Sequence, residues 1–121
     1  MILGLHHVQI TIPSDREAEA RRFYIDLLGL REIAKPKNLR PSGFWVQVGE
    51  HSVHVSSEDG VNRMATRAHI AYEVSDLDHW RARLTDAGFG VEDQAPFGNV
   101  VGRFHLRDPF GNMIEIIQQL D

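Results

Sequence analysis

The sequence predicts an α+β fold made of two tandem βαβββ modules, whose curled sheets surround a cup-shaped site. Two observations predict it. The same order of segments, a strand, a helix and three strands, occurs twice within the 121 residues. Related positions also recur about half the chain length apart, because His7 and His69 open the first strand of each half while His54 and Glu115 lie in the last. Agreement of segment order and offset is the signature of an internal repeat.

Chain length and composition are those of one globular domain. Hydrophobic residues make up 42% and charged residues 25% of the 121 residues, within the usual globular range. A chain of this length is long enough for one core and too short for two ordinary domains. We therefore expect a single domain over residues 1–121, with one module at residues 1–57 and the other at residues 67–121.

Composition also excludes several classes of function. The chain has no cysteine, which rules out disulfides, thiolate metal sites and a cysteine nucleophile. A net charge of -4 argues against a nucleic-acid partner, which usually requires a basic face. No segment has the pattern of a signal peptide or a membrane span. We expect a cytoplasmic protein with a small-molecule partner and no membrane partner.

The first module begins with a strand at residues 5–12, in which apolar and polar side chains alternate. Ser14 and Glu17 then form a capping-box pattern, which predicts the start of a helix. The helix carries apolar residues at helical spacing and ends at Gly29. Strands are predicted at residues 30–34, 44–48 and 52–56, with a loop rich in proline and lysine at residues 35–43.

The second module follows a polar linker at residues 57–67 and repeats the order of the first. Its first strand is predicted at residues 68–74, and the Ser-Asp-Leu-Asp sequence at residues 75–78 caps a helix that ends at Gly88. A short strand at residues 89–93 and a loop at residues 94–102 lead to the last two strands. Asp108, Pro109, Phe110, Gly111 and Asn112 form the tight turn of this closing hairpin.

Four polar residues at equivalent places in the two modules predict a metal site in the cup: His7, His54, His69 and Glu115. Imidazole and carboxylate groups are ligands of divalent Zn, Mn, Fe, Co and Ni. If the curled sheets converge, these side chains can surround one ion and leave a position open for substrate. The alternative is that each polar face is polar only because it faces water.

The remaining histidines have less weight. His6 and His51 fall on the opposite strand faces from His7 and His54, and His79 lies in a charged helix, so we interpret them as structural or surface residues. His105 shares the predicted face of Glu115. His105 is therefore either a solvated residue, a residue that orients a metal ligand, or an acid/base group.

Strand alternation also predicts residues that contact substrate. Gln9, Trp45 and Gln47 line the pocket if the polar faces point inward. Arg103, and Arg40 from the loop, could hold an anionic group of the substrate. The basic cluster at residues 35–40 is more simply a solvated loop than a polyanion site. The loop that contains it is the best candidate for a lid over the pocket.

Three segments resemble the vicinal oxygen chelate superfamily, which includes glyoxalases, fosfomycin-thiol transferases, extradiol dioxygenases and bleomycin-resistance proteins. They are residues 5–12 (LHHVQITI), residues 23–29 (FYIDLLG) and residues 107–115 (RDPFGNMIE). The resemblance spans nearly the whole chain. It identifies the superfamily well and the reaction poorly.

The resemblance implies metal binding by His7, His69 and Glu115, the two-histidine, one-carboxylate set of the thiol transferases and dioxygenases. His54 stands where glyoxalases place a second glutamate, which weakens a strict glyoxalase assignment but leaves a possible fourth ligand. Relatives of this size are commonly dimers, so the resemblance also implies a homodimer with sites shared between subunits.

These observations predict a divalent-metal-dependent, glyoxalase-like lyase or isomerase whose small, oxygen-rich, anionic substrate chelates the metal through two oxygens. Glu115 and His54 are the candidate catalytic residues if either can leave the metal, and His105 if neither does. Three alternatives remain open. They are a non-catalytic binding protein of the bleomycin-resistance type, a ferrous extradiol-type dioxygenase and an accessory module with a vestigial site.

Overall fold

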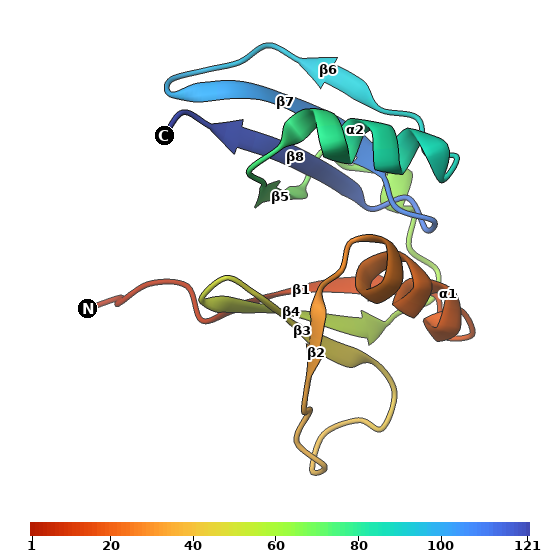
Figure 1. Ribbon diagram of the computed structural model, residues 1–121. Helices are drawn as coiled ribbons and strands as arrows, with labels where there is room; N and C mark the ends of the chain where they lie inside the picture. The colour runs from red at the N-terminus through yellow and green to blue at the C-terminus, as the bar shows by residue number, and fades with distance from the viewer. The chain divides into compact units, whose positions relative to one another are not determined.

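The computed structural model describes residues 1–121 and divides into two compact units, residues 1–61 and residues 62–121 (Figure 1). Each unit contains one four-stranded sheet and one main helical segment. The order strand, helix and three strands occurs in both units. The predicted α+β fold with two tandem βαβββ modules is therefore confirmed.

The sheet of the first unit has the strand order β1-β4-β3-β2. Its strands are β1 (His7–Ile12), β2 (Arg31–Ile33), β3 (Phe44–Val48) and β4 (His51–Ser57). Strand β1 runs parallel to β4, and the other pairs are antiparallel. In this ladder His54 pairs with Gln9 on one side and with Trp45 on the other. Paired residues share a sheet face, so three polar or aromatic side chains stand side by side.

Helix α1 (Glu17–Arg21) of the first unit continues directly into a π-helix, η1 (Arg22–Leu27). The π-helical spacing is visible where the Leu28 amide donates to the Phe23 carbonyl, five residues earlier, at 2.9 Å. Phe23 and its neighbours Ala20 and Tyr24 are buried. The helical segment ends at Gly29 as predicted, where a φ of 73° favours glycine.

The predicted capping box at the start of α1 is wrong. The Ser14 hydroxyl donates to Asp59 at 2.7 Å, and the Glu17 carboxylate accepts from the Gly43 amide at 2.6 Å. The N-cap position is Arg16, which has no side-chain capping bond. Both predicted capping groups therefore bind partners that are remote in the sequence.

The sheet of the second unit has the matching strand order β5-β8-β7-β6. Its strands are β5 (His69–Glu73), β6 (Glu92–Gln94), β7 (Val100–Arg107) and β8 (Met113–Gln119). Strand β5 runs parallel to β8, and the other pairs are antiparallel. Helix α2 (Leu77–Asp86) contacts β8, and the buried residues Leu84, Phe104 and Ile116 belong to the core of this unit.

Helix α2 begins within the predicted capping sequence, and Asp76 is its cap. The Asp76 carboxylate accepts from the His79 amide at 3.1 Å, which satisfies one of the free amides of the first turn. The helix ends before Gly88, whose φ of 93° again suits glycine.

The closing hairpin is confirmed, and Asp108 organises its turn. One carboxylate oxygen of this buried residue accepts from the amides of Phe110, at 2.9 Å, and Asn112, at 2.8 Å. The Asp108 amide donates to the Asn112 carbonyl at 2.9 Å, and Gly111 has a φ of 103°. The turn thus fixes the register between strands β7 and β8, in which His105 pairs with Glu115.

Several predicted boundaries are wrong. Strand β1 begins at His7 rather than at residue 5, and the strand predicted at residues 89–93 lies at Glu92–Gln94. Strand β7 begins at Val100, inside the predicted loop, and the linker contains a 3-10 helix, η2 (Arg63–Ala65). None of the helices combines the length and the apolar character needed to cross a membrane.

Candidate functional site

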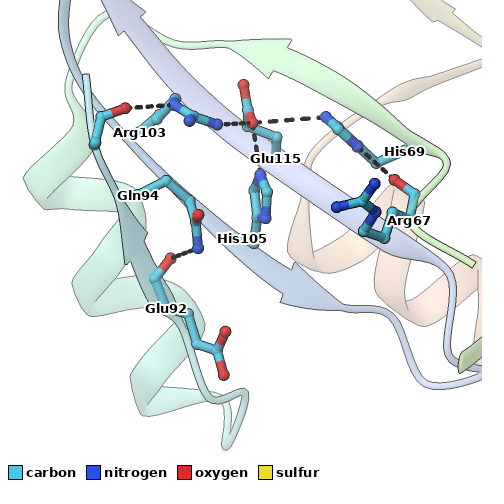
Figure 2. A network of polar contacts seen from close by, with 8 residues as sticks. Arg67, His69, Glu92, Gln94, Arg103, His105 and Glu115 are labelled. Atoms are coloured by element: carbon cyan, nitrogen blue, oxygen red, sulfur yellow. Dashed lines mark hydrogen bonds and ion pairs between the residues drawn. The ribbon is translucent and has the colours of Figure 1, made fainter. Parts of the chain in front are cut away.

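Three neighbouring strands of the second unit bring His69, His105 and Glu115 together (Figure 2). Glu115 on β8 pairs with His105 on β7 and with Ala71 on β5, two residues after His69. Side chains two residues apart on a strand share a face, so all three site residues stand on the same side of the sheet. The potential ligand atoms of these three residues lie within 4.8 Å of one another.

Oxygen Oε1 of Glu115 is the centre of this cluster. The Nε2 atom of His105 lies 2.6 Å from it, and the Nε2 atom of His69 lies 3.6 Å from it. An ionised carboxylate only accepts hydrogen bonds, so His105 donates through Nε2. Glu115 is 4% exposed, which removes most of the water that would otherwise solvate its charge.

His69 is held in one tautomer by its second ring nitrogen. Its Nδ1 atom lies 2.8 Å from the Arg67 carbonyl oxygen, which can only accept, so Nδ1 carries the proton (Figure 2). In the neutral ring Nε2 is then unprotonated and points toward Glu115. This is the arrangement by which a histidine is oriented as a metal ligand.

Arg103 completes the charge balance around Glu115. Its Nη1 atom donates to Glu115 Oε1 at 2.7 Å, and its Nε atom donates to the Ala95 carbonyl at 2.9 Å. The guanidinium also lies over the Phe97 ring, 5.0 Å from the centroid. Burial raises the pKa of Glu115, but hydrogen bonds and charges from His105 and Arg103 outweigh burial, and the pKa of Glu115 lies below its ordinary value.

The residues of this cluster fit a divalent metal ion. Two imidazoles and one ionised carboxylate are the donor set preferred by first-row metals. Ligand atoms about 2.1 Å from one ion lie within about 4.2 Å of each other. The observed spread of 4.8 Å is only slightly wider than this limit. His69, His105 and Glu115 could therefore hold a metal, although Arg103 and His105 now contact the same carboxylate oxygen.

The first unit places three rings in a column on its sheet. The Trp45 and His54 rings stack with centroids 3.7 Å apart, and the His54 and His7 rings stack at 4.0 Å. His54 is consequently buried, at 6% exposure, although it belongs to the polar face of its strand. Burial lowers the pKa of His54, and the nearby His7 and His6 lower it further, which favours the neutral ring.

A cavity of about 610 Å³ opens beside this ring column. Gln9, Trp45 and His54 line it, together with residues of the loop that follows β2. Gln47 does not line it; its side-chain amide donates to the Gly49 carbonyl at 2.7 Å. The substrate roles of Gln9, Trp45, Gln47 and Arg103 stay predictions.

The structure brings together some predicted site residues within each unit. His7 and His54 are neighbours in the first unit, and His69, Glu115, His105 and Arg103 are neighbours in the second. The metal site that combines His7 and His54 with His69 and Glu115 stays a prediction. Sequence reasoning missed Lys35 and Thr11 as residues lining the cavity. The alternation that selected Gln9 also places Thr11 on that face, whereas Lys35 lies in the basic loop, whose path the strand patterns do not define.

Comparison with known proteins identifies the family. Residues 4–116 match the family model described as the glyoxalase/bleomycin resistance protein/dioxygenase superfamily. No curated protein matches the chain. A crystal structure of a Bacillus anthracis protein assigned to the glyoxalase family is 37% identical, with a TM-score of 0.88 over 99% of this chain and 98% of that chain.

Two fosfomycin resistance proteins share the fold at lower identity. FosX from Listeria monocytogenes, complexed with Mn(II) and sulfate, is 15% identical, with a TM-score of 0.77 over 99% of this chain and 93% of its own. FosX from Mesorhizobium loti is 18% identical, with a TM-score of 0.69 over 99% of this chain and 95% of its own. By the family model and the Bacillus anthracis relative, the chain belongs to the glyoxalase/bleomycin resistance protein/dioxygenase superfamily.

Proposed function

We propose that this protein is a divalent-metal-dependent, glyoxalase-like enzyme whose small, oxygen-rich, anionic substrate chelates the metal through two neighbouring oxygens. The carrying observation is the cluster of His69, His105 and Glu115, whose ligand atoms lie within 4.8 Å of one another around a buried carboxylate. Structural alternatives account poorly for this combination, because a solvated sheet face does not require two imidazoles beside a buried acid.

His69 and Glu115 are the ligands best supported by the structure. The Arg67 carbonyl orients His69 with Nε2 toward Glu115, and the lowered pKa of Glu115 keeps it ionised at neutral pH. A bound divalent ion would supply Lewis-acid stabilisation of negative charge that develops on a substrate oxygen. The fold relative FosX from Listeria monocytogenes was crystallised with Mn(II), and Zn, Fe, Ni and Co suit the same donors.

His105 has two possible roles in this proposal. Its Nε2 atom donates to Glu115 at 2.6 Å. This hydrogen bond can orient the carboxylate and stabilise its ionised form, or it can be the route by which the two groups exchange a proton. His105 is therefore either a third metal ligand or the acid/base group beside the metal. His7 and His54 are the ligands that we propose from the other module, in a homodimer with shared sites.

Metal content tests the proposal directly. Protein purified without chelators or a His-tag is analysed for bound metals, alongside the variants His69→Ala and Glu115→Gln. His79→Ala is the matched control, because His79 is an exposed histidine on helix α2 of the same unit. We expect stoichiometric metal in the wild type and in the control, and loss of metal from both site variants.

Other outcomes separate the rival functions. A metal-free wild type that still binds small molecules would contradict the proposal and favour a sequestering protein. Oxygen uptake with catechols in the ferrous form would favour a dioxygenase, because glyoxalase-type isomerisation consumes no oxygen. For His105→Ala, lost metal indicates a ligand, whereas retained metal with lost turnover indicates an acid/base group.

A further inference from the structure

We propose that the cavity of the first unit binds an oxyanion of a small ligand, preferably a doubly charged one, through Lys35 and Arg40. This inference rests on the proposed function, because the cavity also contains His54, a candidate metal ligand. The inference identifies residues that would bind the part of the ligand that does not contact the metal. The supporting observations are the fixed ends of the loop that carries both cations, the charges in the cavity and the aromatic rings that also line it.

The loop after β2 is tied to the unit at its far end. The Lys35 Nζ atom donates to the Ser42 carbonyl at 2.7 Å, and the Gly43 amide donates to Glu17 at 2.6 Å. Gly43 passes so close to β4 that a Cβ atom there would lie 2.3 Å from the Val55 carbonyl oxygen. These contacts fix the two ends of the loop to each other and to the unit, and the exposed residues between them include Arg40.

The charges in the cavity favour an anion. Lys35 and Arg40 are the cationic side chains of its lining, and Glu58 is the one acidic side chain. Arg40 is exposed and forms no hydrogen bond or ion pair within the protein, so its fork of N–H donors is available to a ligand. Guanidinium and ammonium groups together suit a phosphate or a carboxylate, and two cations favour a doubly charged group over a singly charged one.

The rest of the ligand would face the ring column. Trp45 and His54, whose rings stack 3.7 Å apart, line the same cavity and present aromatic surface to it. A ligand anchored at Lys35 and Arg40 can therefore extend its uncharged, oxygen-bearing end toward His54. The cavity volume of about 610 Å³ suits a small organic molecule.

Trp45 also provides the measurement. The chain contains two tryptophans, so Trp80→Phe leaves Trp45, which lines the cavity, as the only one. In this background the protein as purified is titrated with inorganic phosphate and, separately, with acetate, at constant ionic strength. We expect saturable fluorescence changes and a dissociation constant at least about tenfold lower for phosphate than for acetate.

Variants of the loop assign the binding to its two cations. We expect Arg40→Ala and Lys35→Met each to raise the phosphate dissociation constant about tenfold or more. Lys37→Ala is the matched control, because Lys37 is exposed in the same loop and does not line the cavity. This control should change the constant less than about twofold, because Lys37 contributes only a screened charge outside the cavity, whereas Arg40 lines the cavity itself.

The same titrations distinguish this inference from the proposed function. Phosphate binding that disappears on metal removal and is unchanged by Arg40→Ala would overturn the inference and leave the metal enzyme intact. Phosphate binding that depends on Arg40 in a protein without metal would support the inference and contradict the metal enzyme. Equal losses in Arg40→Ala and Lys37→Ala would indicate a general charge effect and also overturn the inference.

Discussion

The Nη1 atom of Arg103 lies 2.7 Å from Oε1 of Glu115, the same oxygen that His105 contacts at 2.6 Å. Arg103 therefore occupies part of the space in which a metal would meet this carboxylate. The positive guanidinium also neutralises part of the Glu115 charge that would attract a metal ion. Binding of a metal and the contact with Arg103 are thus expected to oppose each other.

Replacing Arg103 should strengthen metal binding. In Arg103→Met the carboxylate loses its competing cation, and we expect Mn(II) or Zn(II) affinity to rise about tenfold, which corresponds to about 1.4 kcal/mol. Calorimetric titration of metal-depleted protein measures this. Arg81→Met is the control, since Arg81 pairs with Asp93 instead. Weaker metal binding in Arg103→Met would show that Arg103 supports the metal site rather than competing with it.

Replacing Gly43 should strongly destabilise the first unit. A Cβ atom at Gly43 would lie 2.3 Å from the Val55 carbonyl oxygen, and the φ of 89° disfavours any other residue. We expect Gly43→Ala to lower the free energy of unfolding by about 3 kcal/mol or more. In Gly60→Ala the φ of 76° is similar but the space is open, so a loss of about 1 kcal/mol is expected. Urea denaturation compares the two, and equal losses would refute the steric argument.

Replacing Asp108 should weaken the closing hairpin. Its carboxylate accepts from the Phe110 and Asn112 amides and, at 2.9 Å, from the Asn112 side chain. Asp108→Ala leaves these donors without an acceptor, and we expect a loss of about 2 to 3 kcal/mol in thermal or urea unfolding. Asp86→Ala, at the exposed end of α2, should change stability by less than about 0.5 kcal/mol. A comparable effect of both substitutions would contradict the role given to Asp108.

Stability should fall at alkaline pH because of Tyr72. Burial raises the pKa of Tyr72 well above its ordinary value, and the negative charge of Asp108 raises it further. The unfolded chain ionises this phenol near about pH 10 while the folded chain keeps it protonated. The contribution is therefore complete below about pH 10 and is lost as the pH rises toward the folded pKa.

The substitution Tyr72→Phe removes the phenol and with it this pH-dependent contribution to stability. We expect the free energy of unfolding of the wild type to decline more steeply above about pH 10 than that of Tyr72→Phe, by up to about 1.4 kcal/mol per pH unit. Urea titrations at several alkaline pH values measure the two slopes. Parallel slopes would show that Tyr72 ionises equally in both states.

Local sequence patterns predicted most elements of this fold, and they failed where a distant partner intervened. Alternation correctly placed Gln9, Trp45 and His54 on one sheet face, since strand geometry depends only on neighbouring residues. The capping box failed because the Glu17 carboxylate binds the Gly43 amide from a remote loop. A capping motif describes what a side chain can bind nearby, and it cannot report a competing partner that folding brings to it.

For the candidate site, too, some features follow from the sequence and others only from the tertiary structure. The residues themselves determined that each half carries imidazoles on one sheet face and that Glu115 lies on the face opposite Ile114 and Ile116. Only the tertiary structure decided that His105 and Arg103 meet at one oxygen of Glu115, and that Lys35 reaches the cavity beside His54. These contacts depend on the register between β7 and β8 and on the path of a loop, both of which are settled by packing between segments distant in the chain.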